Sequence, residues 1–150
     1  MRYFALILLL SLTMTACNKE PRFSKKLMKG ETWKISGLTV DDEYYGYYGN
    51  WLVTQDVNIY DSVPSIQWSG NGQTAMFQWQ FQDKGKTFEI SYKDPTCVNC
   101  STPPEDLDLQ CYYLSGKYEV EVHKKDKMRF LSNNTIGFPG QKVVISIDRK

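Results

Sequence analysis

The chain has few of the groups on which familiar catalytic sites depend. It contains one histidine, His123, and the alternating pattern around it predicts that this side chain points to solvent, opposite to Tyr118, Val120 and Val122. No nucleophile stands at a recognisable spacing from it, so serine–histidine and cysteine–histidine catalysis are poorly supported. The chain also lacks a glycine-rich phosphate loop and the spaced acidic loop that binds calcium. We therefore expect a protein that is not an enzyme and that holds no cofactor or metal ion.

Net charge is nearly absent as well. Lys and Arg number 18 and Asp and Glu number 17, and no run of basic residues stands out. A neutral chain has no electrostatic footprint for nucleic acid, and the missing basic run argues against a polybasic patch for a membrane surface. We expect no nucleic-acid partner, and we expect any attachment to a membrane to be covalent.

One apolar run exists, at the N-terminus, and it is too short to cross a bilayer as a helix. Arg2 precedes the run from Phe4 to Leu12, and Thr13-Met14-Thr15-Ala16-Cys17 follows it. This order is typical of a secretory signal. Its ending resembles the lipobox of bacterial lipoproteins, although Met14 stands where that pattern usually has Leu. The resemblance implies cleavage before Cys17, acylation of this cysteine and an anchor of two or three acyl chains in a lipid bilayer.

The expected domain organisation follows from this signal. It comprises a lipoprotein signal peptide (1–16), a lipidated tether (17–26) and one β-barrel domain (27–150). The residue after the cysteine is Asn18, whereas the best-known sorting rule places Asp there in lipoproteins that stay in the inner membrane. The resemblance therefore implies a lipid-anchored protein of the outer membrane, with the periplasmic and cell-surface faces both open.

From Trp33 to Ile147, apolar residues recur at every second position between short turns, which predicts half-buried antiparallel strands. Asn71-Gly72 predicts a type I′ hairpin turn, and a β-bulge at Gly37 would keep both halves of the first strand facing the core. We expect an all-β fold, a small up-and-down antiparallel β-barrel of about eight strands, because closure removes two unpaired edges. A two-layer sandwich is the alternative.

Two details of this barrel stay open or rest on local signals. The eighth strand comes either from within residues 51–59 or from residues 107–114, depending on how the looser segments pair. Ser24 is expected to cap a short helical turn that ends at Gly30 and plugs one end of the sheet.

Three short motifs add a resemblance. The strand that opens with Gly30-Glu31-Thr32-Trp33, the aromatic hairpin at 77–85 and the late strand at 118–122 followed by Met128-Arg129-Phe130 resemble the lipocalin-like domain of small bacterial lipoproteins. The resemblance covers Leu27 to Ile147 and implies a small up-and-down barrel. Ligands vary widely within such families, so the fold does not give the function.

Three cysteines remain besides Cys17. Cys97 and Cys100 lie in a proline-bounded loop, and Cys111 lies near or within a strand. In an exported chain thiols pair before they meet metal, so we expect a structural disulfide from Cys111 to Cys97 or Cys100. A Cys97–Cys100 bridge with Cys111 buried, a zinc site that adds His123, and a redox pair are the alternatives.

The most unusual segment is aromatic. Its candidate ligand-binding or partner-binding residues are Tyr44, Tyr45, Tyr47, Tyr48 and Trp51. Rings with polar tips are enriched at binding surfaces, although the same rings could instead pack over one barrel end as a plug. If Pro64 divides residues 51–68 into two strands, as we favour, this segment and the cysteine loop lie at the same barrel end.

Two functions fit these features. The first is a membrane-anchored envelope lipoprotein whose barrel or aromatic loop binds a small apolar or glycan ligand. The alternative is a non-catalytic interaction or structural lipoprotein that docks on another envelope protein through its tyrosine-rich loop, without a pocket.

Overall fold

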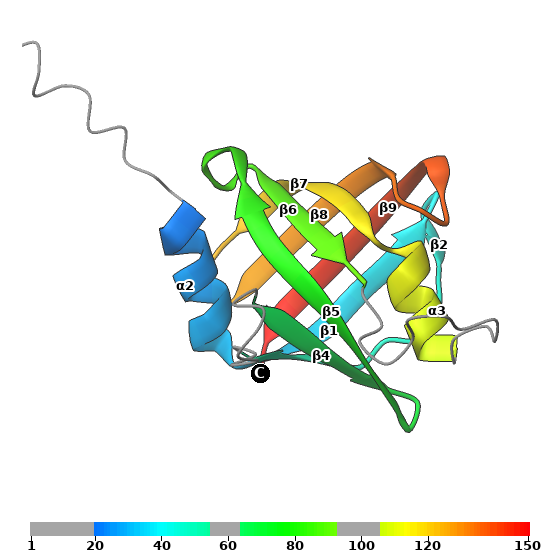
Figure 1. Ribbon diagram of the computed structural model, residues 1–150, viewed down its shortest axis with the longest axis horizontal. Coiled ribbons are helices and arrows are strands. Elements are labelled where there is room, and N and C mark those ends of the chain that lie inside the picture. Colours follow the sequence, from blue (N-terminus) through cyan, green and yellow to red (C-terminus); the bar gives the residue numbers. More distant parts are fainter. Residues whose placement is uncertain (1–19, 55–63, 93–105) are drawn as a thin grey trace, which may run out of the picture.

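The computed structural model describes residues 20–54, 64–92 and 106–150. Their elements, shown in Figure 1, are α2 (Glu20–Gly30), β1 (Thr32–Val40), β2 (Glu43–Tyr44), β3 (Asn50–Thr54), β4 (Ser65–Gly70), β5 (Gln73–Gln82), the 3₁₀ turn η1 (Asp83–Gly85), β6 (Thr87–Ser91), α3 (Asp106–Tyr113), β7 (Gly116–His123), β8 (Lys127–Asn134) and β9 (Pro139–Arg149). No helix among these residues is long and apolar enough to cross a membrane.

The strands form a closed barrel. Each strand from β3 to β8 pairs antiparallel with the next in sequence, and β1 pairs with β3 on one side and with β9 on the other. The short β2 extends β1 as a small hairpin. The predicted up-and-down antiparallel barrel is therefore confirmed, with eight strands in the closed ring. β3 and β4 are separate strands, as expected from Pro64.

Two local predictions about the backbone are confirmed. The register between β1 and β9 shifts between Ile35 and Gly37, so Trp33, Ile35 and Leu38 all reach the core. This shift is the expected bulge. At the turn from β4 to β5, Asn71 and Gly72 have φ of 51° and 75°, the positive values that a type I′ turn requires.

A second bulge, in β7, was not foreseen. The register with β8 shifts between Val120 and Val122, so Val122 pairs with Arg129 and His123 pairs with the buried Met128. Cross-strand partners point to the same face of a sheet, so the bulge turns Val122 outward and His123 inward. The expectation that His123 points to solvent is wrong, because strict alternation was extended through a position where it breaks.

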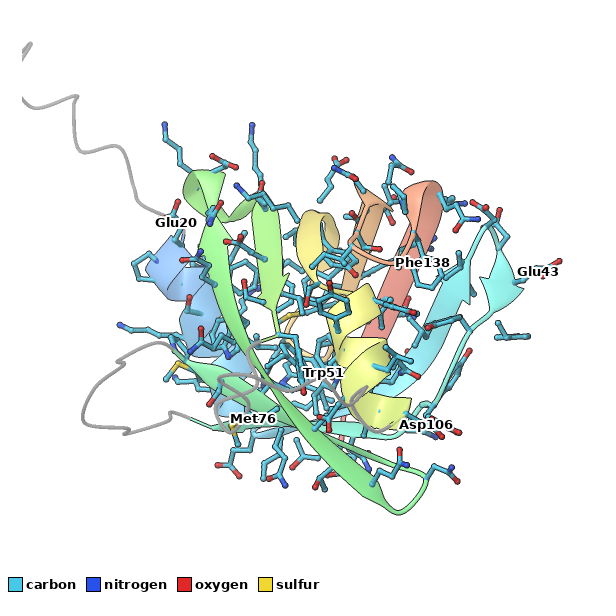
Figure 2. The ribbon with its side chains drawn as sticks, turned by 45° about the vertical axis from the view of Figure 1, so that its right-hand side comes forward. Glu20, Glu43, Trp51, Met76, Asp106 and Phe138 are labelled. Carbon is cyan, nitrogen blue, oxygen red and sulfur yellow. The ribbon has the colours of Figure 1, made fainter. Side chains whose placement is uncertain are left out.

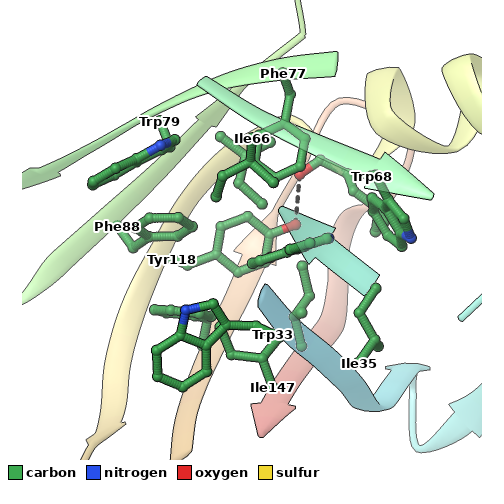
Figure 3. Close-up of a cluster of buried hydrophobic side chains, with 14 of the residues drawn as sticks. Trp33, Ile35, Ile66, Trp68, Phe77, Trp79, Phe88, Tyr118 and Ile147 are labelled. Carbon is green, nitrogen blue, oxygen red and sulfur yellow. Dashed lines mark hydrogen bonds between the residues drawn. The ribbon is translucent and has the colours of Figure 1, made fainter. Parts of the chain in front are cut away.

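Aromatic side chains fill the barrel. Its largest fully buried residues include all four tryptophans, Trp33, Trp51, Trp68 and Trp79, together with Tyr118, Phe77, Phe88 and Phe130. Figure 3 shows Tyr118 among these rings, with its hydroxyl donating to the backbone carbonyl of Leu114 at 2.5 Å. The rings of Phe88 and Phe130 stack with centroids 4.4 Å apart. The interior is therefore a packed core in the part of the barrel that the structure describes.

A helix covers each end of the barrel, α2 on one side and α3 on the other (Figure 1). In α2, the spacing of Phe23, Leu27 and Gly30 places one face against the barrel, where the Trp33 indole donates to the carbonyl of Leu27 at 2.9 Å. The helix begins at Glu20, not at the expected cap Ser24, and so takes in residues 20–26 of the segment expected to be a tether.

Residues 106–113 form a helix, so residues 107–114 do not supply the eighth strand; β3 supplies it. Leu107, Cys111 and Leu114 are buried and follow the helical spacing i, i+4, i+7. Asp106 and Asp108 lie in the first turn, where the helix dipole favours negative charge.

Candidate functional site

The tyrosine segment lies at the barrel end that α3 covers. Tyr44 is 86% exposed, and Tyr45, Tyr47 and Tyr48 are half-buried and pack against the core. Trp51, by contrast, is fully buried inside the barrel between Phe77 and Trp68. The expectation that Trp51 shares a binding surface with the tyrosines is therefore wrong. Trp51 lies near the start of β3, and its side chain points into the barrel.

Hydrogen bonds fix the segment in place. The side chain of Gln110 in α3 accepts from the backbone N–H of Tyr47 at 2.6 Å and donates to its carbonyl at 2.8 Å. The Trp68 indole donates to the Tyr48 carbonyl at 3.1 Å, and the Tyr48 hydroxyl donates to the Leu38 carbonyl at 3.3 Å. Three of the four tyrosines thus belong to a plug over the barrel end, the alternative that the sequence left open.

This plug is part of a larger aromatic surface. Tyr45 meets Phe138 with ring centroids 4.8 Å apart, Phe138 meets Tyr113 at 6.1 Å, and Tyr113 lies 6.0 Å from Tyr112. We call this surface the aromatic rim; it consists of Tyr44, Tyr45, Tyr47, Tyr48, Tyr112, Tyr113, Ile136 and Phe138. Figure 2 shows Phe138 and Glu43 on the side of the barrel away from Glu20.

Half of the rim is accessible to a partner. Tyr44, Tyr112, Tyr113 and Ile136 are exposed by 86%, 42%, 36% and 54%. Burial, followed by the nearby Tyr113, raises the pKa of the half-buried Tyr45, so its hydroxyl keeps its proton at neutral pH. The sequence did not predict four members of the rim, Tyr112, Tyr113, Ile136 and Phe138. They come from two other segments, which only the closed barrel brings next to the tyrosine segment.

An open hollow of about 350 Å³ adjoins the rim where β6 and β7 meet. Its lining residues are Glu89, Ile90, Ser91, Tyr92, Ser115, Gly116 and Ile136. Ile136 belongs to both the hollow and the rim. The Ser115 hydroxyl already accepts from the backbone N–H of Tyr92 at 2.9 Å and donates to the Cys111 carbonyl at 2.9 Å, so it holds the hollow's shape.

Cys111 lies in a helix, not near or within a strand as expected. It is a free, buried thiol, and burial, with a smaller effect of Asp108, raises the pKa of the Cys111 thiol far above its ordinary value. A free Cys111 does not support the expected bridge from it to Cys97 or Cys100, and it agrees with the alternative in which Cys111 is a buried core residue. Cys97, Cys100 and the lipidation residue Cys17 lie outside the described residues, so a Cys97–Cys100 bridge and the acylation of Cys17 stay predictions. His123 lies at the α2 end and Cys111 at the α3 end, so no zinc site can join them.

Comparisons with known proteins give no family for this chain. No family model matches the chain, and no curated protein is significantly similar to it in sequence. Among solved structures, the chain is similar to Japanin from Rhipicephalus appendiculatus bound to cholesterol, with 8% identity, a TM-score of 0.45, and coverage of 81% of this chain and 76% of Japanin. A likeness at this level carries no argument about the function of this chain.

Proposed function

We propose that this protein is a non-catalytic, lipid-anchored protein of the outer membrane that docks on another envelope protein through the aromatic rim. The observation that carries the proposal is the gathering of four exposed large side chains, Tyr44, Tyr112, Tyr113 and Ile136, at one end of a barrel whose interior is packed. Tyrosine gives a large contact area at a low entropic cost, and an exposed apolar surface of this kind needs a reason.

The packed interior favours docking on a partner over a ligand held inside the barrel. A ligand held inside the barrel would have to displace rings such as Trp51 and Phe88, which are fully buried and in mutual contact. A packed interior therefore favours a partner site on the outside of the barrel. The lone histidine supports the non-catalytic role, since it lies at the opposite end of the barrel from the rim.

The exposed tyrosines provide the test. We expect a variant with Tyr44→Ser, Tyr112→Ser and Tyr113→Ser to keep the melting temperature of the wild type within a few degrees and to lose its partner in crosslinking and affinity capture from envelope fractions. A Leu52→Ser/Met76→Ser variant is the matched control, because these side chains are also exposed, by 40% and 41%, but lie on the barrel wall.

A captured protein counts only if it is retained by the control, lost by the rim variant, and bound again when purified. If the rim variant captures the same proteins as the wild type, the proposal is wrong. The half-buried Tyr45, Tyr47 and Tyr48 are unsuitable for this test, because they pack against the core and their loss would destabilise the plug.

A second candidate is a small apolar or glycan ligand in the open hollow beside the rim. The hollow has a volume of about 350 Å³, and apolar and polar residues line it, Ile136, Tyr92 and Ser91 among them. Native mass spectrometry of protein isolated from its own envelope would show the ligand as added mass. We expect Ser91→Trp, which fills the hollow, to remove that mass, whereas a bare protein mass in the wild type would refute this candidate.

A further inference from the structure

The end of the barrel that α2 covers is strongly basic, although the sequence has no basic run. We call this end the α2 face and define it as α2, the turn 83–86, the turn 124–127 and residues 148–150. Its basic residues are Arg22, Lys25, Lys26, Lys29, Lys84, Lys86, Lys124, Lys125, Lys127, Arg149 and Lys150. Eleven basic side chains from four separate segments thus stand against four acidic ones, Glu20, Asp83, Asp126 and Asp148.

Contacts between these segments show that they form one surface. The Glu20 carboxylate accepts from the backbone N–H of Lys84 at 2.7 Å, which joins α2 to the first turn. The Arg149 guanidinium donates to the Lys29 carbonyl at 2.9 Å, and the Arg149 N–H donates to the Asp126 carbonyl at 2.8 Å. The second turn and the chain's last residues therefore meet α2 on the same end of the barrel.

The charge on this face is available to a partner. The side chains of Lys25, Lys84, Lys86, Lys124 and Lys125 are exposed. An ion pair on this face joins Lys127 to Asp148 at 3.9 Å. Such a long, solvent-exposed ion pair is weak, so it takes little from the positive charge of the face. The described residues outside this face carry nine acidic and four basic side chains, so the face has a charge of +7 and the rest of the described residues a charge of −5.

Acidic residues gather at the opposite end. Asp41, Asp42 and Glu43 lie at the turn from β1 to β2, and Asp106 and Asp108 open α3. The near-zero net charge therefore hides a charge asymmetry along the barrel, with the basic end at α2 and the acidic end at the aromatic rim.

The short distance from α2 to the expected acylation site indicates what the α2 face binds. α2 begins at Glu20 on this face, and two residues separate Glu20 from Cys17, the expected acylation site. Even fully extended, that linker spans only about 10 Å. An acyl chain on Cys17 would therefore hold the α2 face against the headgroups of the bilayer.

We propose that the α2 face docks on the surface of a bilayer that contains anionic phospholipid, and that this contact orients the barrel with the aromatic rim away from the membrane. Basic side chains near an anionic leaflet each add to the attraction, which salt screens within a Debye length. The choice of a bilayer over other polyanions rests on the proposed anchor; the affinity for anionic lipid does not, because it needs no acyl chain.

The following test separates the affinity for anionic lipid from the effect of the acyl anchor. All buried apolar residues among those described lie within 27–147, so a chain that starts at Asn18 keeps the whole core and lacks the lipidation site. We expect this chain to sediment with vesicles of phosphatidylcholine and phosphatidylglycerol at low salt, and not at high salt or with phosphatidylcholine alone.

Two variants with the same net charge isolate the face. Lys124→Gln/Lys125→Gln should weaken partitioning on the order of 30-fold, because each lysine near an anionic surface contributes about 5-fold. Lys117→Gln/Lys142→Gln, at the other end, should leave it nearly unchanged. The rim variant with Ser at 44, 112 and 113 should bind vesicles as the wild type does. Failure of the proposed docking through the rim would therefore leave the proposal for the α2 face intact.

Absence of binding to anionic vesicles would overturn the proposal. So would equal losses in the two lysine pairs, which would show that net charge alone matters. Tighter retention on duplex DNA than on the vesicles would show that the α2 face prefers another polyanion, and it would also overturn the proposal. Circular dichroism of each variant checks that the barrel is folded.

Discussion

Acidification should destabilise the barrel through His123. The ring of this residue lies against the ring of Phe23 of α2 in a tilted arrangement, with centroids 3.8 Å apart, and is edge-on to the ring of Phe81 at 5.9 Å. Burial, aided by the charges of Lys26 and Arg22, lowers the pKa of His123 to about 4, against the opposing effect of the carbonyls of Phe23 and His123 itself. The native state therefore holds this imidazole neutral between Phe23 and Phe81.

The sign and the size of the effect follow from proton linkage. In the unfolded chain the pKa of a histidine is about 6.5, so between pH 6.5 and about 4 the unfolded state binds more protons than the native state. The contribution to stability is complete above pH 6.5 and decreases as the pH falls to about 4. Its upper limit is about 3 kcal/mol. Because the ring is partly exposed, screening reduces the expected loss to roughly 1–2 kcal/mol.

Urea unfolding at a series of pH values measures this loss. Carboxylates also titrate in the range, so the result is the difference between the wild type and His123→Phe, with His123→Gln as a second variant in case the larger ring packs poorly. We expect the wild type to lose about 1–2 kcal/mol more than either variant on acidification. Lys26→Gln should raise the pKa of His123 and reduce the loss. Equal pH dependence of the wild type and both variants would refute the reasoning.

Three further predictions concern packing. Gly30→Ala should cost at least about 2 kcal/mol in the free energy of unfolding, because a Cβ there would overlap the Trp33 indole; thermal melts measure it, with Gly37→Ala, whose Cβ would meet only Ser146 at 3.5 Å, as the control. Gln110→Leu should cost about 2 kcal/mol and speed hydrogen exchange at the Tyr47 amide, and unchanged exchange would contradict the bond between them. Cys111 should resist thiol reagents until the barrel unfolds, whereas rapid labelling of the native protein would show that it is accessible.

Much of the barrel could be predicted because local signals and the closed sheet agree. Alternation with a period of two gave the strands, the Asn71-Gly72 turn gave a hairpin, and Gly37 marked a bulge that the register between β1 and β9 confirms. These features depend on neighbours in sequence, and an up-and-down barrel places such neighbours side by side.

The errors arose where two periods compete. In residues 107–114 the first residues alternate between apolar and polar, which is a strand pattern. Leu107, Cys111 and Leu114 also follow the helical period, and in the structure these three side chains are buried on one face of a helix. In β7 the alternation is regular up to Val120, and nothing in the sequence marks the bulge that turns His123 inward. The cost of a mistaken parity is high, since one added residue exchanges the faces of everything after it.

The surfaces on which the proposed functions depend could not be predicted, because each is assembled from distant segments. The aromatic rim joins residues 44–48 to residues 112–113 and 136–138, and the α2 face joins four segments that lie up to 130 positions apart. Composition alone pointed the wrong way for charge: a sum of +1 suggested no electrostatic preference, although the described residues divide into +7 on the α2 face and −5 elsewhere. An asymmetry of this kind orients a small domain in an external field even when its net charge is near zero, because the torque depends on the separation of charge and not on its sum. On a bilayer with anionic lipid, the same fold that buries the tryptophans would therefore present the tyrosines to the space beyond the membrane.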